Sequence, residues 1–234
     1  MNISVVITAY NEEVYLPNCL KALGAQDYPK ENFEIIVVDN NSTDKTAAIA
    51  KSFGARVVEE KQQGYVFGLN TGMYAAAGEI IAVTDADTFV SKDWLSTISN
   101  SFDEVGVVGV TGSLDNLSSK PVVNFLMASF FAIFLKIVFA LGLPHLCGFN
   151  FAVKKEAFLK VGGLDLRFEM APDVDLGIRL AKIGRVVYNS GMLVSTSSRR
   201  WRDNPLKTIY EYIKGFVGAV ILRRPPSVKQ KIIR

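Results

Sequence analysis

Asp85 and Asp87 are the residues of this sequence that most clearly suit a chemical task. They follow the apolar run 80–83, and in an extended segment residues two apart point to the same side. Two carboxylates on one side repel each other unless a cation lies nearby. Their oxygen atoms suit Mg²⁺ or Mn²⁺, with phosphate oxygens filling the other coordination positions. The alternative is a solvated turn, since Asp-x-Asp is common by itself.

Two further polar clusters follow apolar runs near the start of the chain. Residues 8–12 read Thr-Ala-Tyr-Asn-Glu and follow the run 5–7; residues 39–44 read Asp-Asn-Asn-Ser-Thr-Asp and follow the run 35–38. The second cluster alone is also a good turn and helix cap. In open α/β sheets, however, ligands bind at the carboxyl ends of the strands. Three polar strand ends on one rim therefore favour a binding site.

Alternating strand and helix patterns in the first half predict the elements that position these clusters. The expected strands are apolar, at 5–7, 35–38, 56–58 and 80–83. The expected helices show helical spacing or capping residues, at 12–23, 42–54 and 66–77. Continuous apolar strands separated by helices are typical of parallel strands covered on both faces. The pattern predicts a Rossmann-like α/β half.

The second half of the chain is less regular. Its expected strands are 107–110, 185–188 and 193–194, and its expected helices are 156–161, 174–183 and 205–222. The last helix places its apolar residues on one stripe and then runs into Arg-Arg-Pro-Pro. We find no internal repeat and no low-complexity linker.

Charge is unevenly spread along the 234 residues, which are enough for one large domain or two small ones. Residues 199–234 hold ten Lys and Arg against Asp203 and Glu211, whereas the rest of the chain is acidic on balance. This asymmetry indicates a polyanionic partner, either nucleic acid or an anionic membrane surface. Hydrophobic residues make up 49% of the chain, which excludes a disordered protein.

The segment 121–143 is the most apolar stretch of the chain, whose mean hydropathy is +0.22. Its longest uncharged run, 121–135, is shorter than the roughly 20 residues that a membrane span needs, and Lys136 then interrupts it. An interfacial or re-entrant helix fits this composition better than a tilted span. A buried core helix is the alternative.

The cysteines and the N-terminus bear on the compartment. Cys19 and Cys147 are too few for a disulfide framework, so a reducing cytosol is the default expectation. Residues 1–8 have no basic region and only a short apolar run, so we interpret them as the first strand rather than a signal peptide.

Six ordered blocks of the sequence resemble the family 2 glycosyltransferases, which have the GT-A fold. The blocks are 6–13 (VITAYNEE), 37–44 (VVDNNSTD), 85–87 (DAD), 148–158 (GFNFAVKKEAF), 161–165 (VGGLD) and 173–180 (DVDLGIRL). The resemblance implies a Rossmann-like nucleotide-binding half, a mixed sheet and helices on both faces. We expect this α/β domain over 1–201, with the membrane-facing helix 121–143 inserted, followed by a basic amphipathic segment at 202–234.

The resemblance implies a site for a nucleotide-diphosphate sugar across the strand ends. The residues expected to bind this donor are Thr8, Ala9, Tyr10, Glu12, Asp39, Asn41, Lys61 and Asp85. Asp39 matches the carboxylate that hydrogen-bonds the base, usually uracil, and Lys61 stands near a glycine where relatives have a basic residue for phosphate. Asp85 and Asp87 match the motif that holds the ribose and a divalent metal, Mn²⁺ or Mg²⁺, on the diphosphate.

Asn150, Arg200 and Trp201 are expected near the acceptor or a phosphate. Arg suits bidentate phosphate contact and Trp can stack on a sugar face, while a basic interfacial anchor explains the Arg-Trp pair equally well. The pair matches the end of a Gln-x-x-Arg-Trp motif that processive members carry. Ser197 replaces the glutamine, which argues against polysaccharide synthesis and export.

Asp173 matches the family's catalytic base, which deprotonates the acceptor hydroxyl. Asp173 and Asp175 are two apart at a helix start, so they do not face the same way. We expect Asp175 to cap the helix or to pair with Arg179 at i+4. The family usually has Glu just before this Asp, where this chain has Pro172.

Together these features predict an inverting, metal-assisted glycosyltransferase with a UDP-linked donor by family habit and, as a hypothesis, a lipid-linked acceptor. Its expected location is the cytoplasmic face of the cell membrane, with the basic tail on anionic lipid. No nucleic-acid partner is expected, because no recognised motif accompanies the tail. The alternatives are a catalytically silent nucleotide-sugar-binding scaffold, supported by Pro172, and a sugar nucleotidyltransferase, whose glycine-rich signature with Arg and Lys is missing from 8–12.

Overall fold

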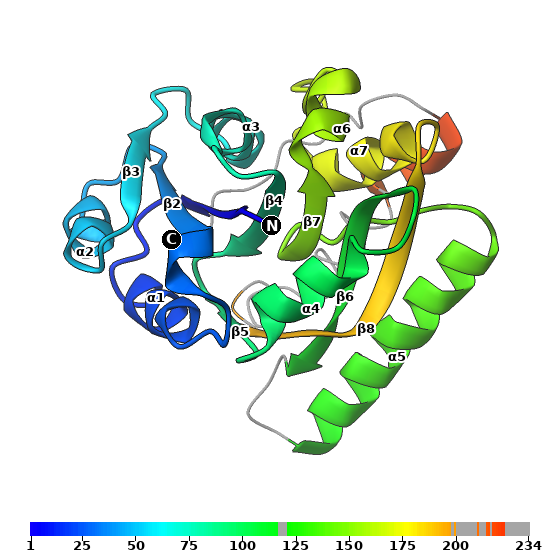
Figure 1. Cartoon of the computed structure of the whole chain (residues 1–234), viewed down its shortest axis with the longest axis horizontal. Helices are drawn as coiled ribbons and strands as arrows, with labels where there is room; N and C mark the ends of the chain where they lie inside the picture. The colour runs from blue at the N-terminus through cyan, green and yellow to red at the C-terminus, as the bar shows by residue number, and fades with distance from the viewer. Residues whose placement is uncertain (117–120, 198, 200–209, 211–213, 216, 223–234) are drawn as a thin grey trace.

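The computed structural model of the chain describes residues 1–116, 121–197, 199, 210, 214–215 and 217–222. Within them, a mixed sheet of eight strands has helices packed on both faces (Figure 1). The strands are β1 (Ile3–Ala9), β2 (Phe33–Asp39), β3 (Arg56–Glu59), β4 (Ile80–Asp85), β5 (Thr88–Val90), β6 (Val107–Asn116), β7 (Asn150–Lys154) and β8 (Arg185–Thr196). The α-helices are α1 (Leu16–Gly24), α2 (Thr46–Ser52), α3 (Tyr65–Ala75), α4 (Trp94–Ser101), α5 (Pro121–Ala140), α6 (Lys155–Lys160) and α7 (Pro172–Leu180), with a 3₁₀ turn at Lys30–Asn32 and a π-helical turn at Val217–Leu222.

The strand order of the sheet is β3-β2-β1-β4-β7-β6-β8-β5. β3, β2, β1 and β4 are parallel, as the apolar runs of the first half predict. β7 runs antiparallel to β4 and to β6, β6 and β8 are parallel, and β5 is antiparallel to β8. The mixed sheet predicted for the GT-A fold is therefore confirmed, and the carboxyl ends of β1, β2, β4, β6 and β8 point to one edge.

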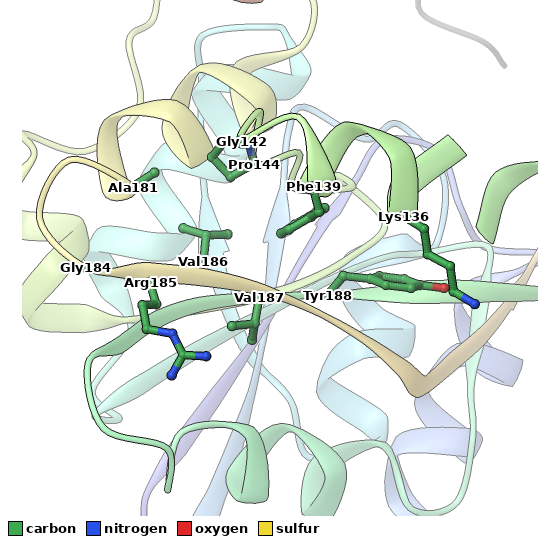
Figure 2. A pocket seen from close by; sticks show the side chains of 10 residues that line it. All are labelled: Lys136, Phe139, Gly142, Pro144, Ala181, Gly184, Arg185, Val186, Val187 and Tyr188. Carbon is green, nitrogen blue, oxygen red and sulfur yellow. The ribbon is translucent and has the colours of Figure 1, made fainter. Parts of the chain in front are cut away.

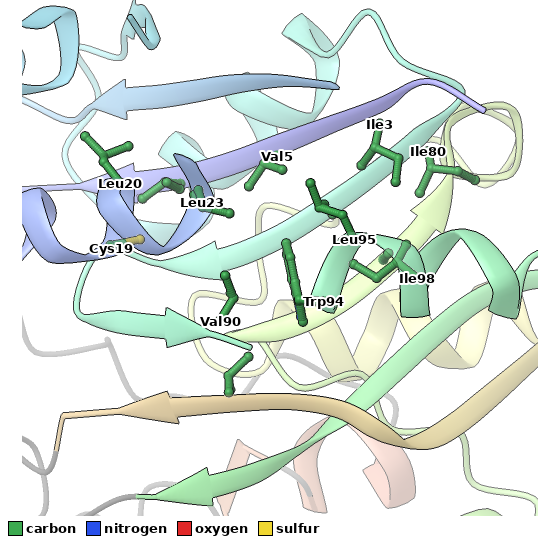
Figure 3. Close-up of a cluster of buried hydrophobic side chains, with 14 of the residues drawn as sticks. Ile3, Val5, Cys19, Leu20, Leu23, Ile80, Val90, Trp94, Leu95 and Ile98 are labelled. Atoms are coloured by element: carbon green, nitrogen blue, oxygen red, sulfur yellow. The ribbon is translucent and has the colours of Figure 1, made fainter. Parts of the chain in front are cut away.

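Two hydrophobic cores cover the two faces of the sheet. The first lies under α1 and α4, and Figure 3 labels its members Ile3, Val5, Cys19, Leu20, Leu23, Ile80, Val90, Trp94, Leu95 and Ile98. The second packs α3, α6 and α7 against β1, β2, β4 and β7. The neighbours Val5 and Val6 are both fully buried but belong to different cores. Burial on both faces explains why the middle of β1 is the continuous apolar run 5–7.

The structure differs from the predicted elements where the local pattern is weak. The helix expected at 12–23 begins at Leu16, and Val14, placed on its apolar stripe, is 70% exposed. The strands expected at 185–188 and 193–194 are one strand, β8. The sequence patterns do not predict β5, β7 or α4. β5 has three residues and β7 has five, too few for a clear alternation of buried and exposed positions.

α5 corresponds to the helix expected at 121–143 and packs against β6 and β8 (Figure 1). Leu135 and Val138 are buried, whereas Ile133, Ile137 and Leu141 are each more than half exposed. In the part of the chain that is described, none of the helices combines the length and the apolar character that a membrane crossing requires. The helix thus has one packed face and one exposed apolar stripe.

Most of the basic segment 202–234 lies outside the described residues, as do Arg200 and Trp201. The turn at Val217–Leu222 belongs to this segment and contacts α7. Ala219 is buried there with Phe168 and Val174. This part of the expected amphipathic helix therefore packs on the domain near the start of α7.

Candidate active site

The register of the parallel strands brings the three polar clusters to one edge of the sheet. Thr8 at the end of β1 pairs with Asp85 at the end of β4. Ala9 pairs with Asp39 at the end of β2. Because the three strands end at one level, the loops that follow them share a rim, which is where open α/β sheets bind ligands.

The loops after β1 and β2 are joined by hydrogen bonds between side chains and backbone. Asn11 and Asn41 have φ angles of 54° and 66°, a conformation that Asn adopts more readily than most residues. Asn11 Oδ1 accepts from the Thr43 amide at 2.8 Å, and Ser42 Oγ accepts from the Asn11 amide at 3.0 Å. Some polar residues of these clusters therefore build the rim itself.

Three of the residues predicted to bind the donor lie together on the β2 side of the rim. Asp39 Oδ1 accepts from the Ser42 amide at 3.1 Å. Asn41 Nδ2 donates to the carbonyl of Lys61 at 2.6 Å, and Lys61 itself is exposed. The structure thus brings Asp39, Asn41 and Lys61 next to one another, although Lys61 comes from a different loop.

Asn40, which the sequence motifs do not single out, fixes the loop that carries Lys61. Its buried amide nitrogen donates to the carbonyls of Glu60 and Gln62 at 2.9 and 2.8 Å. Its Oδ1 accepts from the amide of Gly64 at 2.8 Å. In the run Asp-Asn-Asn the sequence gives no signal for which side chain turns inward, so this positioning role becomes visible only in the fold.

Asp85 ends β4, and Ala86 and Asp87 form a turn before β5. The extended geometry expected from Asp85 to Asp87 is therefore wrong, since the chain turns while Ala86 is buried in the core. The carboxylate of Asp87 accepts a hydrogen bond from the hydroxyl of Ser197. The antiparallel pair of β5 and β8, in which Thr88 lies opposite Thr196, brings Ser197 to this turn.

Arg199 places its guanidinium between two carboxylates at the same turn. Nη2 donates to Glu12 Oε1 and to Asp87 Oδ2, both at 2.8 Å, and Nε donates to Asp87 Oδ2 at 3.2 Å. Burial raises the pKa of Glu12 above its usual value, and the hydrogen bond from Arg199 opposes this shift. In the sequence, the neighbouring Arg200 matches the family motif. The pairing of β5 with β8, which brings Arg199 to this turn, is not predicted by any local sequence pattern.

Asp173 lies in the first turn of α7, near the end of β4. Thr84 of β4 pairs with Asn150 at the start of β7, and the amide of Gly148, two residues earlier, donates to Asp173. Burial raises the pKa of Asp173 to about 6, while hydrogen bonds from backbone amides, including those of Val174 and Gly148, act in the opposite direction. A carboxylate with such a pKa is suited to accept a proton near neutral pH.

Asp175 has a different role from Asp173. Arg179 Nε donates to Asp175 Oδ2 at 2.8 Å, which confirms the predicted i,i+4 pair. Arg179 Nη1 also donates to the carbonyls of Val161 and Gly163 at 2.8 and 2.7 Å. Asp175 therefore helps to anchor α7 to the preceding loop.

Asn150, predicted near the acceptor, is fully buried. Its Oδ1 accepts from Trp94 Nε1 at 2.9 Å, and its Nδ2 donates to the carbonyls of Ser113 and Met192 at 3.0 and 2.8 Å. These bonds join β7 to α4, β6 and β8. The structure thus does not bring its side chain to the acceptor side, because the amide is used inside the fold.

Asp85 and Asp87 supply oxygen ligands of the kind that Mg²⁺ and Mn²⁺ prefer. Among the described residues, His, Cys, Asp and Glu side chains form no group of three or more that could hold a metal ion by itself. A cation bound by one or two carboxylates together with the phosphates of a substrate does not need such a group. The donor set at 85–87 therefore fits a cation that binds with a diphosphate.

A hollow of about 530 Å³ lies between the ends of α5 and α7 and the first residues of β8 (Figure 2). Its lining includes Lys136, Phe139, Arg185 and Tyr188 but no carboxylate. The first residues of β8 lie at the sheet edge opposite to the strand ends that carry Asp39 and Asp85. The hollow is therefore separate from the candidate active site.

Comparison with known proteins finds a matching family model and similar glycosyltransferases. Residues 4–162 match the family model described as Glycosyl transferase family 2. Glycosyltransferase AglE of Haloferax volcanii is 35% identical over an alignment of 119 positions that covers 48% of this chain and 39% of that protein. A Methanococcus voltae protein, named dolichyl N-acetyl-alpha-D-glucosaminyl phosphate 3-beta-D-2,3-diacetamido-2,3-dideoxy-beta-D-glucuronosyltransferase, is 26% identical over an alignment of 222 positions that covers 83% of this chain and 66% of that protein.

Solved structures show the same fold. Mannosyltransferase PcManGT of Pyrobaculum calidifontis, in complex with GDP-Man and Mn²⁺, aligns with a TM-score of 0.68 and 22% identity over 90% of this chain and 62% of its own. TarS 1–349 of S. aureus, in complex with UDP-GlcNAc, aligns with a TM-score of 0.68 and 21% identity over 85% of this chain and 59% of its own. The chain spans less than two thirds of the length of each of these four proteins.

Proposed function

The chain belongs to glycosyl transferase family 2, and we propose that it moves a sugar from a nucleotide-diphosphate sugar to an acceptor hydroxyl or phosphate, with inversion at the anomeric carbon. The observation that carries the proposal is the position of the Asp173 carboxylate, which lies against Gly148 close to the end of β4, and burial raises the pKa of this carboxylate to about 6. Asp173 lies near the end of β4, where Asp85 is the last residue of the strand. Asp87, in the turn that follows, supplies a second carboxylate there. Similar proteins bind GDP-Man with Mn²⁺ and UDP-GlcNAc, which supports a donor of this class.

The donor would lie across the ends of β1, β2 and β4. We propose UDP as the nucleotide, because it is the one that members of the family commonly use. The residues proposed to contact the donor are those of the rim: Thr8, Ala9, Tyr10, Glu12, Asp39, Asn41, Lys61 and Asp85. Within this set, Asp39 would accept hydrogen bonds from the base, and the exposed Lys61 would approach the diphosphate.

A divalent cation, when bound, supplies charge neutralisation of the leaving diphosphate. Asp85 and Asp87 are the residues that would hold it, because Asp85 ends β4, Asp87 lies in the turn that follows, and both are partly buried. A structure with the same fold was solved with GDP-Man and Mn²⁺, which supports a divalent cation as the cofactor.

Asp173 is proposed to accept the proton of the acceptor hydroxyl. As the acceptor oxygen forms its bond to the anomeric carbon, the bond from that carbon to the phosphate oxygen breaks, and the nucleotide diphosphate leaves with the electron pair. A single displacement of this kind inverts the configuration. A carboxyl with a pKa of about 6 is mostly ionised at neutral pH and more basic than an ordinary aspartate. A phosphate acceptor, already ionised, would not need the base.

We propose that the acceptor is lipid-linked and that the protein works on the cytoplasmic face of a membrane. The exposed stripe of α5, with Ile133 and Ile137, supports this location, as does the excess of basic residues in 199–234. The name of the Methanococcus voltae relative includes a dolichyl phosphate sugar. A water-soluble acceptor used equally well in the presence and absence of membranes would contradict this part of the proposal.

A thermal-shift screen of UDP-, GDP- and dTDP-sugars, each with and without Mn²⁺, tests the proposed function. A ligand present at about 100 times its Kd adds about 2.7 kcal/mol to the apparent stability, so one donor class should raise Tm clearly. Asp173→Asn should keep this rise and lose turnover. If no nucleotide sugar raises Tm, the proposal is wrong; a rise without transfer or hydrolysis by the wild type would favour the silent scaffold.

A further inference from the structure

Arg199 is the cation that the structure places at the proposed metal ligand Asp87. Its guanidinium is shared between Asp87 and Glu12, with Nη2 2.8 Å from an oxygen of each. The three side chains are only 13–17% exposed. The guanidinium carbon also lies 4.1 Å from the centre of the Tyr15 ring, a cation–π contact. The site therefore contains an internal positive charge.

We propose that Arg199 is a displaceable internal cation, which neutralises Asp87 when no metal is bound and is left on Glu12 alone when a divalent cation takes Asp87. This inference rests on the proposed function in one respect, the role of Asp87 as a metal ligand. It adds that Arg199 lowers the affinity of the site for the metal. Arg199 is in this sense a positioning residue that sets metal affinity.

The bonding of Asp87 explains why metal and Arg199 compete. Oδ2 of Asp87 accepts from Ser197 Oγ and from both Nε and Nη2 of Arg199, so these donors occupy one of the two carboxylate oxygens on which a cation could bind. A divalent ion and a guanidinium on the same carboxylate also repel each other, and repulsion is strong where side chains are shielded from water.

Glu12 is a second ion-pair partner of Arg199. Nη2 of Arg199 lies 2.8 and 3.1 Å from the two oxygens of Glu12, so this ion pair does not depend on Asp87. Contact with the Tyr15 ring also does not involve Asp87. If its contact with Asp87 breaks, Arg199 therefore still has the Glu12 carboxylate and the Tyr15 ring as partners. Its charge is then not left unpaired in a position shielded from water.

Binding of Mn²⁺ alone to the full chain, measured from the electron paramagnetic resonance signal of the free ion, tests this inference without an activity assay. Arg199→Ala should bind Mn²⁺ about tenfold more tightly than the wild type, because one repelling charge is removed and Asp87 is freed. Arg199→Gln keeps hydrogen-bond donors and lacks the charge, so it should show the same change if Arg199→Ala fails to fold. Arg167→Ala is the matched control, because Arg167 is an exposed partner of Asp165 outside the site.

The outcomes separate the inference from the proposed function. Loss of Mn²⁺ binding in Asp87→Asn would show that the metal site depends on Asp87. If, at the same time, both Arg199 variants bind Mn²⁺ no more tightly than the wild type, the inference is wrong and the metal site stands. If Asp87→Asn binds Mn²⁺ as the wild type does, the metal role of Asp87 fails, and the inference with it. In the wild type, Mg²⁺ should also shift the Arg199 Nε–Hε resonance, identified by its loss in Arg199→Lys; an unmoved resonance at saturating Mg²⁺ would overturn the displacement.

Discussion

Gly148 lies so close to Asp173 that a Cβ atom at position 148 would stand 3.2 Å from Asp173 Oδ2. The same atom would be 3.1 Å from the hydroxyl of Tyr65. Gly148→Ala should therefore shift the Asp173 carboxylate by a few tenths of an ångström. Because a misplacement of about 1 Å can cost 10²-fold in rate, we expect kcat to fall roughly 10- to 100-fold with a small change in Tm. Steady-state kinetics and a thermal melt measure both.

Gly24→Ala is the matched control for this substitution. A Cβ at position 24 would meet no atom within 4 Å, and Gly24 ends α1 on the surface. Its kcat should equal that of the wild type. Equal kcat values for Gly148→Ala and Gly24→Ala would show that the position of Asp173 does not limit the reaction.

The raised pKa of Asp173 predicts a pH dependence of activity. Burial raises this pKa from 3.8 to about 6, so kcat/KM should rise as the pH increases through about 6 and then level off. Asp173→Asn should lower kcat about 10²- to 10⁴-fold and leave donor binding measurable. Rates across pH 5–8 at saturating donor check this, and an unchanged rate in Asp173→Asn would remove Asp173 as the base. A wild-type kcat/KM that does not fall as the pH decreases below about 6 would contradict the predicted titration of Asp173.

The same shift predicts the effect of Asp173 on stability. A carboxyl whose pKa is higher in the folded chain than in the unfolded one stabilises the fold below pH 3.8, and this contribution is lost as the pH rises to about 6. At neutral pH the ionised, partly buried Asp173 therefore costs the fold free energy. We expect Asp173→Asn to raise Tm at pH 7.5 and to have little effect at pH 4. Melts at the two pH values test the sign, and a lower Tm at pH 7.5 would contradict it.

Local sequence patterns predict the parallel half of the fold and its rim well, because the information is local. Val5 and Val6 lie in an unbroken apolar run, and the polar loops begin where such runs end, so strand and site are visible together. The position of Arg199 depends on the pairing of β5 with β8, which joins residues more than 100 apart in sequence. Asn150 stands in a recognised block, yet no pattern tells whether its amide turns inward or toward a substrate. The inward direction follows from contacts with three other elements.

The exposed stripe of α5 predicts binding to membranes. Ile137 is 55% exposed on this stripe, so Ile137→Gln should remove apolar area that could insert among lipids. We expect the variant to co-sediment less with anionic vesicles than the wild type, at unchanged Tm. Val105→Gln is the control, because Val105 is 92% exposed in the turn before β6. Equal sedimentation of both variants would argue against α5 as the membrane contact.

The buried amide of Asn150 predicts a loss of stability rather than a loss of acceptor binding. Asn150→Ala removes the acceptor for Trp94 Nε1 and the donors for the carbonyls of Ser113 and Met192, all inside the protein. Leaving such groups unpaired costs about 1–3 kcal/mol each, and partial relaxation keeps the total near 3 kcal/mol. In a domain of this size that corresponds to a fall in Tm of roughly 6–12 °C. Below the new Tm, KM for the acceptor should stay as in the wild type, so a raised acceptor KM with an unchanged Tm would return Asn150 to the acceptor site.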